Sequence, residues 1–342
     1  MQDRFLRACW RKPVDRTPVW YMRQAGRYLA EYRELRETHG ILEIAKTPKL
    51  AAQVARLPVE KLGVDAAILF ADIMLPLEPM GVGFHIEENV GPVIHEPIAG
   101  RKDVDRLATI DPEKDLPYIA ETIGLLRDAV DVPVIGFSGA PFTLASYLIE
   151  GRPSRDFAKT KALMFHDEET WRRLMDVLAD MVATYLRFQV KAGAPAVQLF
   201  DSWVGALGPA DYVRYVQPFS RAVFEGTRDL GVPRIHFGTN TATLLELMRD
   251  AGGEVIGLDW RIPIDEAWRR LGDGVAVQGN LDPAALLGGK DFAVARAREV
   301  LERVRRRTGH IFNLGHGVSP GTSPDVLAAV TETVHAFGGE SS

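Results

Sequence analysis

The chain has 342 residues, of which 46% are hydrophobic and 25% charged, a balance typical of a globular protein with a substantial core. The formal net charge is -5 and no long basic block is present, which argues against a nucleic-acid-binding protein. The single cysteine, Cys9, argues against disulfides and a cysteine-based zinc site, and no apolar stretch reaches the ~20 residues of a membrane span, so we expect a cytoplasmic protein without membrane contacts.

Short apolar runs rich in β-formers recur along the chain. Most are continuous rather than alternating, the pattern of strands that are buried on both faces. The eight runs, in chain order, lie at 18–22, 66–70, 133–138, 196–200, 234–238, 255–259, 275–279 and 310–315.

Segments with helical spacing separate these runs. They lie at 48–62, 116–129, 167–192, 239–252, 291–309 and 323–339, and the fourth begins at an Asn or Thr cap. Eight strand-then-helix units predict an α/β fold of the (β/α)8 TIM-barrel type. The rival is a doubly wound open sheet, which usually carries a glycine-rich dinucleotide loop after its first strand, where this chain has Arg-Gln-Ala-Gly-Arg.

Two segments interrupt this rhythm. Residues 81–98 alternate and turn at Asn89–Pro92, which predicts a β-hairpin inserted after the second strand. Residues 139–156 predict a short helix and a glycine-containing loop after the third strand. Neither a linker nor an internal repeat is evident, so we expect residues 1–342 to form one domain.

Polar side chains follow each predicted strand, and a barrel would bring them to one mouth. In chain order they are Arg23, Gln24 and Arg27; Asp72; Ser138; Asp201 and Ser202; Thr239 and Asn240; Asp259 and Arg261; Asn280 and Asp282; and His316.

Each of these residues also has a purely structural interpretation. Asp282, followed by Pro283, is better explained as a helix cap, and Asp201 could be another. His316 could be a structural histidine in a glycine turn. Asp72 is harder to explain that way, because a lone carboxylate in an apolar stretch needs a partner, and we favour a functional role for it.

The arginines of the first loop indicate an anionic substrate. Guanidinium groups bind carboxylates or phosphates through paired hydrogen bonds, and the small Ala25 and Gly26 between Arg23 and Arg27 leave space for a bulky ligand. The glycine-rich segment 313–322 could cradle a phosphate, so at this point a phosphosugar enzyme remains an alternative.

With these residues in place, the sequence closely resembles the uroporphyrinogen decarboxylase family from about residue 3 to residue 337. Long, ordered and correctly spaced blocks carry this resemblance. They are "PVWYMRQAGRYLAEYRE" (18–34), "LFADIMLPLEPMG" (69–81), "GFSGAPFTLASYLIEG" (136–151), "QLFDSWVGALGP" (198–209) and "IFNLGHGVSPGTSPD" (311–325).

The resemblance implies a single-domain barrel that forms a homodimer with facing clefts. It implies conversion of uroporphyrinogen III to coproporphyrinogen III in heme and chlorophyll synthesis, with no metal or organic cofactor. The substrate-contacting positions that it implies are Arg23, Gln24, Ala25, Gly26, Arg27, Asp72, Tyr147, Ser202 and His316, where some relatives have threonine in place of Ser202.

The chemistry suggests a role for each group. Asp72 would accept the inward-pointing pyrrole N–H groups and stabilise the cation that forms on the ring. Arg23 and Arg27 would bind acetate or propionate groups, and one of them could assist proton delivery although its pKa exceeds ~12. His316 is expected to titrate near neutrality and suits a proton donor better, with the alternative that it only holds a propionate. Tyr147 offers a hydroxyl to carboxylates or to Asp72, as does Ser202.

Two rivals remain at this stage. A corrinoid-linked methyltransferase on a similar barrel would need zinc held by His and Cys near the mouth, whereas Cys9 precedes the first predicted strand. A non-catalytic tetrapyrrole carrier would keep the cleft, but the retained Asp72, Tyr147 and His316 argue against the loss of catalysis.

Overall fold

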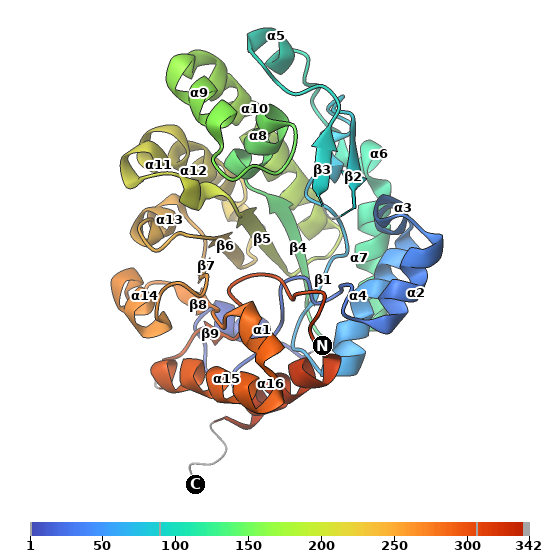
Figure 1. The fold of residues 1–342 in the computed structure, drawn as a ribbon, viewed down its shortest axis with the longest axis vertical. Helices are drawn as coiled ribbons and strands as arrows, with labels where there is room; N and C mark the ends of the chain where they lie inside the picture. The colour runs from blue at the N-terminus through green and yellow to red at the C-terminus, as the bar shows by residue number, and fades with distance from the viewer. Residues whose placement is uncertain (1, 89, 306, 338–342) are drawn as a thin grey trace.

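A curled sheet of parallel strands lies at the centre of the protein, and helices cover its outer side (Figure 1). The structure is a computed structural model that describes residues 2–88, 90–305 and 307–337. The seven strands, in sheet order, are β1 (Ala67–Ile68), β4 (Val134–Gly139), β5 (Ala196–Asp201), β6 (Arg234–Gly238), β7 (Val255–Gly257), β8 (Ala276–Gln278) and β9 (His310–Ile311). All neighbouring pairs are parallel, so the carboxyl ends of these strands share one edge.

The predicted first strand, 18–22, is wrong as a strand, because the structure gives it a single parallel bridge between Val19 and Phe312. Its other backbone hydrogen bonds go to side chains or to loop residues and do not form a strand ladder. Val19 exchanges bonds with Asp65, receiving one from the Asp65 N–H at 2.7 Å and donating its own N–H to the carboxylate at 2.8 Å. The segment thus bonds both to the residues before β1 and to those after β9, at the two edges of the sheet.

Buried polar side chains cross the interior of the curled sheet. Trp20 donates its indole N–H to Gln278 of β8 at 2.9 Å, and Gln278 donates to Gln198 of β5 at 3.0 Å. All three side chains are buried, so these bonds replace the water that the polar groups have lost. The chain of bonds links segment 18–22 to strands on the far side of the sheet.

Helices fill the connections between strands. In chain order they are α1 (Arg4–Cys9), α2 (Ala30–Thr38), α3 (Ile41–Lys46), α4 (Pro48–Leu62), α5 (Arg101–Val104), α6 (Pro112–Asp115), α7 (Pro117–Ala129), α8 (Pro141–Glu150), α9 (Ala158–His166), α10 (Glu168–Lys191), α11 (Pro209–Tyr215), α12 (Gln217–Glu225), α13 (Leu245–Ala251), α14 (Ile264–Leu271), α15 (Lys290–Val304) and α16 (Pro324–Ala336). Short 3₁₀ turns are η1 (Leu75–Leu77), η2 (Val204–Ala206), η3 (Arg228–Leu230) and η4 (Pro283–Gly288).

Local signals set the ends of the helices that the sequence predicts. Gly63 ends α4 with a left-handed φ of 65°, which glycine adopts without steric cost. Asp167 begins α10 by accepting the Thr170 N–H at 3.0 Å. The helices predicted at 48–62, 116–129 and 167–192 are therefore confirmed to within one or two residues.

The helix predicted over 239–252 begins later than expected, at Leu245. Asn240 has a left-handed φ of 57°, and its N–H donates to the carboxylate of Asp259 at 2.6 Å instead of starting a helix. The expected cap residue is thus bound to the loop that follows β7, and residues before α13 form a turn at the carboxyl edge of the sheet.

A second, two-stranded sheet follows η1. Strands β2 (Phe84–Glu87) and β3 (Gly91–Ile94) pair antiparallel, with His85 opposite Val93. Asn89, which the sequence prediction places in the connecting turn, lies outside the described residues. Ile94 donates its N–H to Gly151 at 2.8 Å, directly after α8, so this sheet is bonded to the end of that helix.

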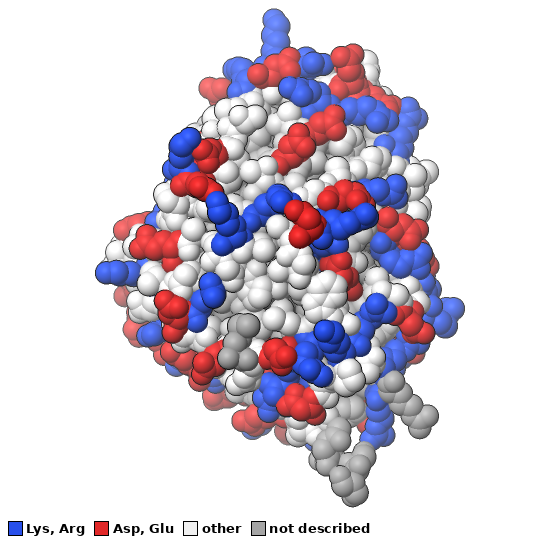
Figure 2. All heavy atoms as spheres, turned by 180° about the vertical axis from the view of Figure 1, so that it is seen from behind, with Lys and Arg blue, Asp and Glu red and all other residues white. Residues whose placement is uncertain are grey.

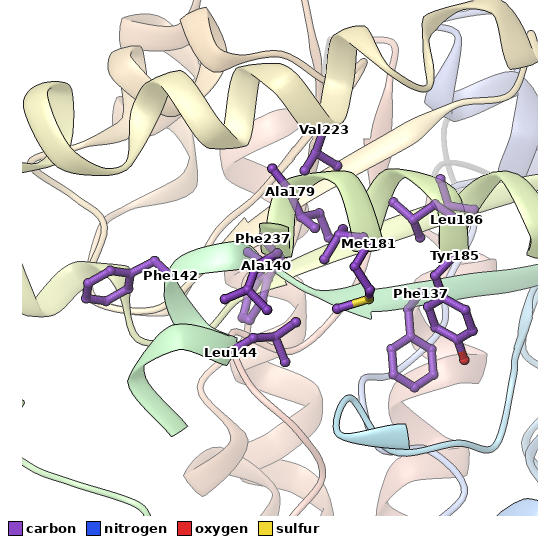
Figure 3. Close-up of a cluster of buried hydrophobic side chains, with 14 of the residues drawn as sticks. Phe137, Ala140, Phe142, Leu144, Ala179, Met181, Tyr185, Leu186, Val223 and Phe237 are labelled. Carbon is purple, nitrogen blue, oxygen red and sulfur yellow. The ribbon is translucent and has the colours of Figure 1, made fainter. Parts of the chain in front are cut away.

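The main core lies between the strands and helices α8, α10 and α12. Figure 3 shows side chains of this core from several elements, among them Leu144 of α8, Met181 of α10, Val223 of α12 and Phe237 of β6. Figure 2 shows the molecule from behind, and on this face charges of both signs are interspersed, in keeping with a small net charge. Among the described residues, no helix is long and apolar enough to cross a membrane.

Candidate active site

The loop that follows Met22 holds the first group of candidate residues. Arg23 adopts a left-handed φ of 58°, and both Arg23 and Arg27 are exposed. A Cβ on Gly26 would approach the Arg23 carbonyl oxygen to 2.8 Å, so the turn itself requires glycine there. The glycine that we expected to make room for a ligand therefore serves the fold of the arginine loop as well.

Gln24 lies under this loop and is completely buried. Its side-chain oxygen accepts the Tyr21 N–H at 3.0 Å, and its amide donates to the Ala66 carbonyl at 3.0 Å, just before β1. Both ends of the amide are thus committed to backbone. We expect Gln24 to position the arginine loop, and direct contact of its side chain with substrate stays a prediction, as it does for the backbone of Ala25.

Asp72 lies after β1, where the carboxyl edge of the sheet begins. It is partly buried, and one carboxylate oxygen accepts the Met74 N–H at 2.8 Å. Within the described chain the other oxygen accepts no hydrogen bond. Burial raises the pKa of Asp72, although the Met74 N–H and the charge of Arg23 oppose this shift. The site is therefore one in which an added hydrogen-bond donor or positive charge would stabilise the carboxylate.

An aromatic stack positions Tyr147 of α8. Its ring lies 3.9 Å from that of Trp203, centroid to centroid, and Trp203 in turn contacts Phe157 at 5.1 Å. Burial raises the pKa of Tyr147, the nearby charge of Asp72 raises it further, and Arg23 opposes both. The phenol therefore stays protonated and can donate a hydrogen bond beside Asp72.

A buried carboxylate is linked to this stack through Thr143. Asp201, at the end of β5, is fully buried and accepts a hydrogen bond from the Thr143 hydroxyl at 3.1 Å. The same hydroxyl oxygen accepts the backbone N–H of Trp203 at 3.4 Å. Ser202 lies between Asp201 and Trp203 and is partly exposed. Asp201 thus has a structural role in ordering the segment that presents Ser202.

Arg27 lies close enough to Tyr32 of α2 for its charge to act on that phenol. Burial raises the pKa of Tyr32, and the charges of Arg36 and Arg27 oppose that shift. The Tyr32 ring packs edge-on against Phe70 at 5.5 Å, two residues before Asp72. Contact of Arg27 with substrate stays a prediction.

Two glycines fix the position of His316. A Cβ on Gly315 would collide with the Trp260 backbone, and a Cβ on Gly317 would collide with the Arg23 side chain. His316 thus lies between the loop that follows β7 and the arginine loop, and both close approaches require glycine. This explains the Gly-His-Gly pattern that the sequence interpretation left as a possible phosphate cradle.

The expectation that His316 titrates near neutrality is wrong. Burial, together with the charges of Arg23 and Arg261, lowers the pKa of the imidazole to about 4, and Asp259 only partly opposes them. At neutral pH the ring is therefore uncharged. It can exchange hydrogen bonds with a carboxyl group, but it is poorly suited to deliver a proton.

We predict that His316→Asn leaves the shape of the pH–rate profile between about pH 6 and 8 unchanged, because no titration of His316 falls in that range. An NMR titration measures this pKa directly. The imidazole signal of His316, identified by its absence in His316→Asn, should titrate with a pKa of about 4. His310 is a useful reference, since burial lowers its pKa to about 4 as well. A signal that titrates near neutrality and disappears in His316→Asn would contradict this account.

Four of the predicted residues, Arg23, Asp72, Tyr147 and His316, lie close enough together for charges of this group to affect pKa values within it. The charge of Arg23 acts on Asp72, Tyr147 and His316, and that of Asp72 acts on Tyr147. Ser202 joins them through its neighbour Trp203. All come from the carboxyl edge of the sheet or from α8, which follows β4 directly.

Sequence reasoning missed the aromatic partners of Tyr147. Trp203 stands in the quoted block "QLFDSWVGALGP", but nothing in its spacing indicates a stack with a residue on α8. Phe157 follows the glycine loop after α8 and has a left-handed φ of 53°. Such a contact depends on how two distant loops fold over the sheet, which periodicity does not report.

Other candidates have structural roles or lie elsewhere. Asp282 accepts the Ala284 N–H at 2.9 Å at the start of η4, which confirms it as a cap. Cys9 is 1% exposed at the end of α1, and burial raises its pKa. Within the ranges that the structure describes, no group of three or more His, Cys, Asp or Glu side chains could hold a metal ion.

Comparisons with known proteins agree on one family. The family model described as "Uroporphyrinogen decarboxylase (URO-D)" matches residues 1–337. The chain is similar to the uroporphyrinogen decarboxylase of Sorangium cellulosum, with 56% identity over 98% of this chain and 97% of that protein. The corresponding figures for the protein of the same name from Streptomyces coelicolor are 54%, 97% and 93%.

Solved structures extend the likeness of the fold. A methyltransferase from Methanosarcina mazei has a TM-score of 0.82 at 22% identity, covering 98% of both chains. A B12-independent methionine synthase from Shewanella sp. W3-18-1 has a TM-score of 0.56 at 12% identity, covering 87% of this chain and 90% of that one. At these identities the likeness concerns the fold alone.

Proposed function

The chain belongs to the uroporphyrinogen decarboxylase family, and from that premise we propose that it converts uroporphyrinogen III to coproporphyrinogen III. It is a carboxy-lyase of tetrapyrrole biosynthesis that removes CO₂ from four acetate side chains and leaves four methyl groups. The observation that carries this function is a partly buried carboxylate, Asp72, under the influence of Arg23 at the carboxyl edge of the parallel sheet.

The substrate supplies the electron sink. Protonation of a pyrrole carbon next to the acetate-bearing carbon turns that ring into a cation. The C–C bond to the carboxylate then breaks, CO₂ leaves, and the released electron pair neutralises the cation. A second proton adds to the exocyclic carbon to give the methyl group, and the first proton leaves the ring carbon, which restores the neutral pyrrole. Because the ring accepts the electrons, the proposed reaction requires no cofactor.

Asp72 acts at the centre of the macrocycle. Its free oxygen accepts pyrrole N–H groups, which all point inward in a domed ring, while the Met74 N–H holds the other oxygen. The carboxylate then lies close to the developing positive charge. In an apolar surrounding the attraction between the carboxylate and the cationic ring is strong, because little water screens it.

The remaining residues hold the periphery of the ring. Arg23 and Arg27 are exposed guanidinium groups that can pair with acetate or propionate. Tyr147 donates its phenol near Asp72, Ser202 offers a hydroxyl, and neutral His316 exchanges a hydrogen bond with a carboxyl group. The proton donor is then an arginine acting through water, or a carboxylic acid of the substrate itself.

The architecture that we propose is one (β/α)8 barrel over residues 1–342. In this barrel, segment 18–22 is the eighth segment and closes the ring between β9 and β1. The bonds from this segment to Asp65 and Phe312, at opposite edges of the sheet, support closure. We also propose that the β2–β3 sheet is an insertion after the second predicted strand, and that the enzyme is a cytoplasmic homodimer with facing clefts. Light scattering of the purified protein tests the dimer.

The methyltransferase alternative has support from the fold alone. The Methanosarcina mazei methyltransferase shares 22% of its residues with this chain, against 56% for the Sorangium cellulosum decarboxylase. Cys9, the one thiol in the sequence, lies on α1, next to β8 and β9. Arg11, two residues later, donates to the Asp273 carbonyl, which precedes β8, so this part of the chain lies near the amino ends of the strands. Stoichiometric zinc in the purified protein would favour this alternative again.

Product analysis tests the function directly. The enzyme is incubated with uroporphyrinogen III without oxygen, and the oxidised products are separated by carboxylate number. We expect hepta-, hexa- and pentacarboxylate intermediates followed by coproporphyrin III. Tight binding of uroporphyrinogen without release of CO₂ would instead identify a tetrapyrrole carrier.

A further inference from the structure

Arg261 lies on the loop after β7 in an unusual combination of restraint and exposure. Its backbone N–H and its Nη1 donate to Asp259 at 3.0 and 2.6 Å. Its guanidinium lies 3.9 Å from the centre of the Trp260 ring, a cation–π contact. Asp259 is 1% exposed, whereas the Arg261 side chain is 42% exposed. The guanidinium is thus held on two sides and open on the others.

A purely structural ion pair in the same protein looks different. Arg234 pairs with Glu254 through both carboxylate oxygens, donates also to the Phe224 carbonyl, and is only 11% exposed. Asp259 does not depend on the Arg261 side chain in this way, because two backbone N–H groups, from Asn240 and Arg261, already bind it. The exposed part of the Arg261 guanidinium is therefore available to a ligand.

The position of Arg261 places it at the candidate site. Gly315 packs against Trp260, and Gly317 packs against Arg23, so the His316 loop spans the space between the two arginine-bearing loops. The charges of Arg23 and Arg261 both act on the His316 imidazole. The site therefore has a positive charge on each side of His316.

We propose that Arg261 is a further carboxylate-binding residue of this site and that it holds a propionate of the tetrapyrrole. This proposal rests on the function proposed above. The substrate carries eight carboxylates, of which the four acetates become methyl groups one after another, while the four propionates persist. An arginine that is fixed by Asp259 and Trp260 cannot follow a group that disappears, so it suits the carboxylate that every intermediate retains.

Binding of coproporphyrinogen III tests this proposal without turnover, because propionates are the only carboxylates of that product. Anaerobic calorimetry with Arg261→Gln should show a Kd at least about tenfold weaker than wild type, with Arg261→Lys in between, since lysine keeps the charge and loses the planar fork. Arg296→Gln removes the same charge from an exposed position on α15 and should bind like wild type.

Kinetics supply a second readout that a structural role would not give. For Arg261→Gln we expect KM to rise about tenfold for both uroporphyrinogen and a pentacarboxylate intermediate, with kcat changed by less than about threefold. Unchanged coproporphyrinogen binding would overturn the proposal. Weaker binding of uroporphyrinogen alone would overturn the propionate assignment, because it would indicate an acetate.

The outcomes separate this proposal from the proposed function. If wild-type protein decarboxylates uroporphyrinogen III and Arg261→Gln behaves identically, the function stands and the role of Arg261 falls. If wild-type protein releases no CO₂, the function falls, whereas the comparison of coproporphyrinogen binding still reports on Arg261. Circular dichroism of both variants verifies that they fold, which we expect because the backbone bonds to Asp259 remain.

Discussion

Replacement of Asp72 by alanine should lower kcat for the first decarboxylation by about a hundredfold to a thousandfold. This is the range found when a group that stabilises transition-state charge is removed. The carboxylate lies at the carboxyl edge of the sheet with one oxygen free of bonds from the described chain. Asp72→Asn should be similarly impaired because it removes the charge, whereas Asp72→Glu should retain part of the activity. Product analysis with uroporphyrinogen III measures all three.

The matched control for Asp72 is Asp282. Each aspartate accepts the N–H of the residue two positions ahead, at 2.8 Å for Asp72 and 2.9 Å for Asp282. Asp282→Ala therefore removes the same local bond and should cost about 1 kcal/mol of stability with full activity. If Asp72→Ala behaved like Asp282→Ala, Asp72 would be no more than a cap.

The same residue predicts a pH dependence. Burial raises the pKa of Asp72, and the mechanism requires the charged carboxylate. Activity should therefore fall on the acid side at a pH above the usual titration range of aspartate, as the carboxylate gains a proton. The acid limb should shift in Asp72→Glu and stay in place in Asp282→Ala.

Replacement of Asp65 by alanine should lower the free energy of unfolding by about 3–5 kcal/mol, the usual cost of removing one partner from a buried charge network. Asp65 is 2% exposed and binds Arg4 and His335, each at 2.7 Å, together with the Val19 N–H. It thus joins α1 and α16 to the segment that bonds to both edges of the sheet. Urea unfolding at neutral pH measures the loss.

Asp15→Ala is the control for this prediction. Arg4 also pairs with Asp15, but that carboxylate is 63% exposed, so its loss should cost less than about 1 kcal/mol. Equal destabilisation by the two substitutions would show that burial of Asp65 contributes nothing.

The network should also make stability depend on pH. Burial alone would raise the pKa of Asp65, but His335, the Val19 N–H and Arg4 outweigh it and leave the pKa below the usual range. The unfolded chain then takes up protons before the folded one does. The contribution of Asp65 is complete above its unfolded pKa of about 3.9 and is lost as pH falls through its lower folded pKa.

Strands whose sequences are continuously apolar were predictable from the chain alone. The runs at 133–138, 196–200 and 234–238 coincide with β4, β5 and β6, because burial on both faces leaves that pattern. The run at 18–22 is equally apolar but forms a single bridge, since Asp65 takes the Val19 N–H through its side chain. Hydrophobicity indicates burial, and it does not indicate which partner binds the backbone.

The candidate site divides in a similar way. The positions of Asp72, Ser202 and His316 after predicted strands follow from the strand-then-helix order of the sequence, and the quoted blocks indicated Tyr147 as a candidate. The state of His316 could not be predicted, because its pKa depends on burial and on two arginines from distant loops. The commitment of Gln24 to backbone and the exposure of Arg261 likewise depend on tertiary contacts.

A crystal structure with coproporphyrinogen III, grown without oxygen, tests the central claim most directly. The account predicts that the Asp72 carboxylate lies beneath the centre of a domed macrocycle and accepts hydrogen bonds from its pyrrole N–H groups, while arginines pair with its propionates. A macrocycle bound elsewhere, with Asp72 bonded only to the Met74 N–H, would contradict it.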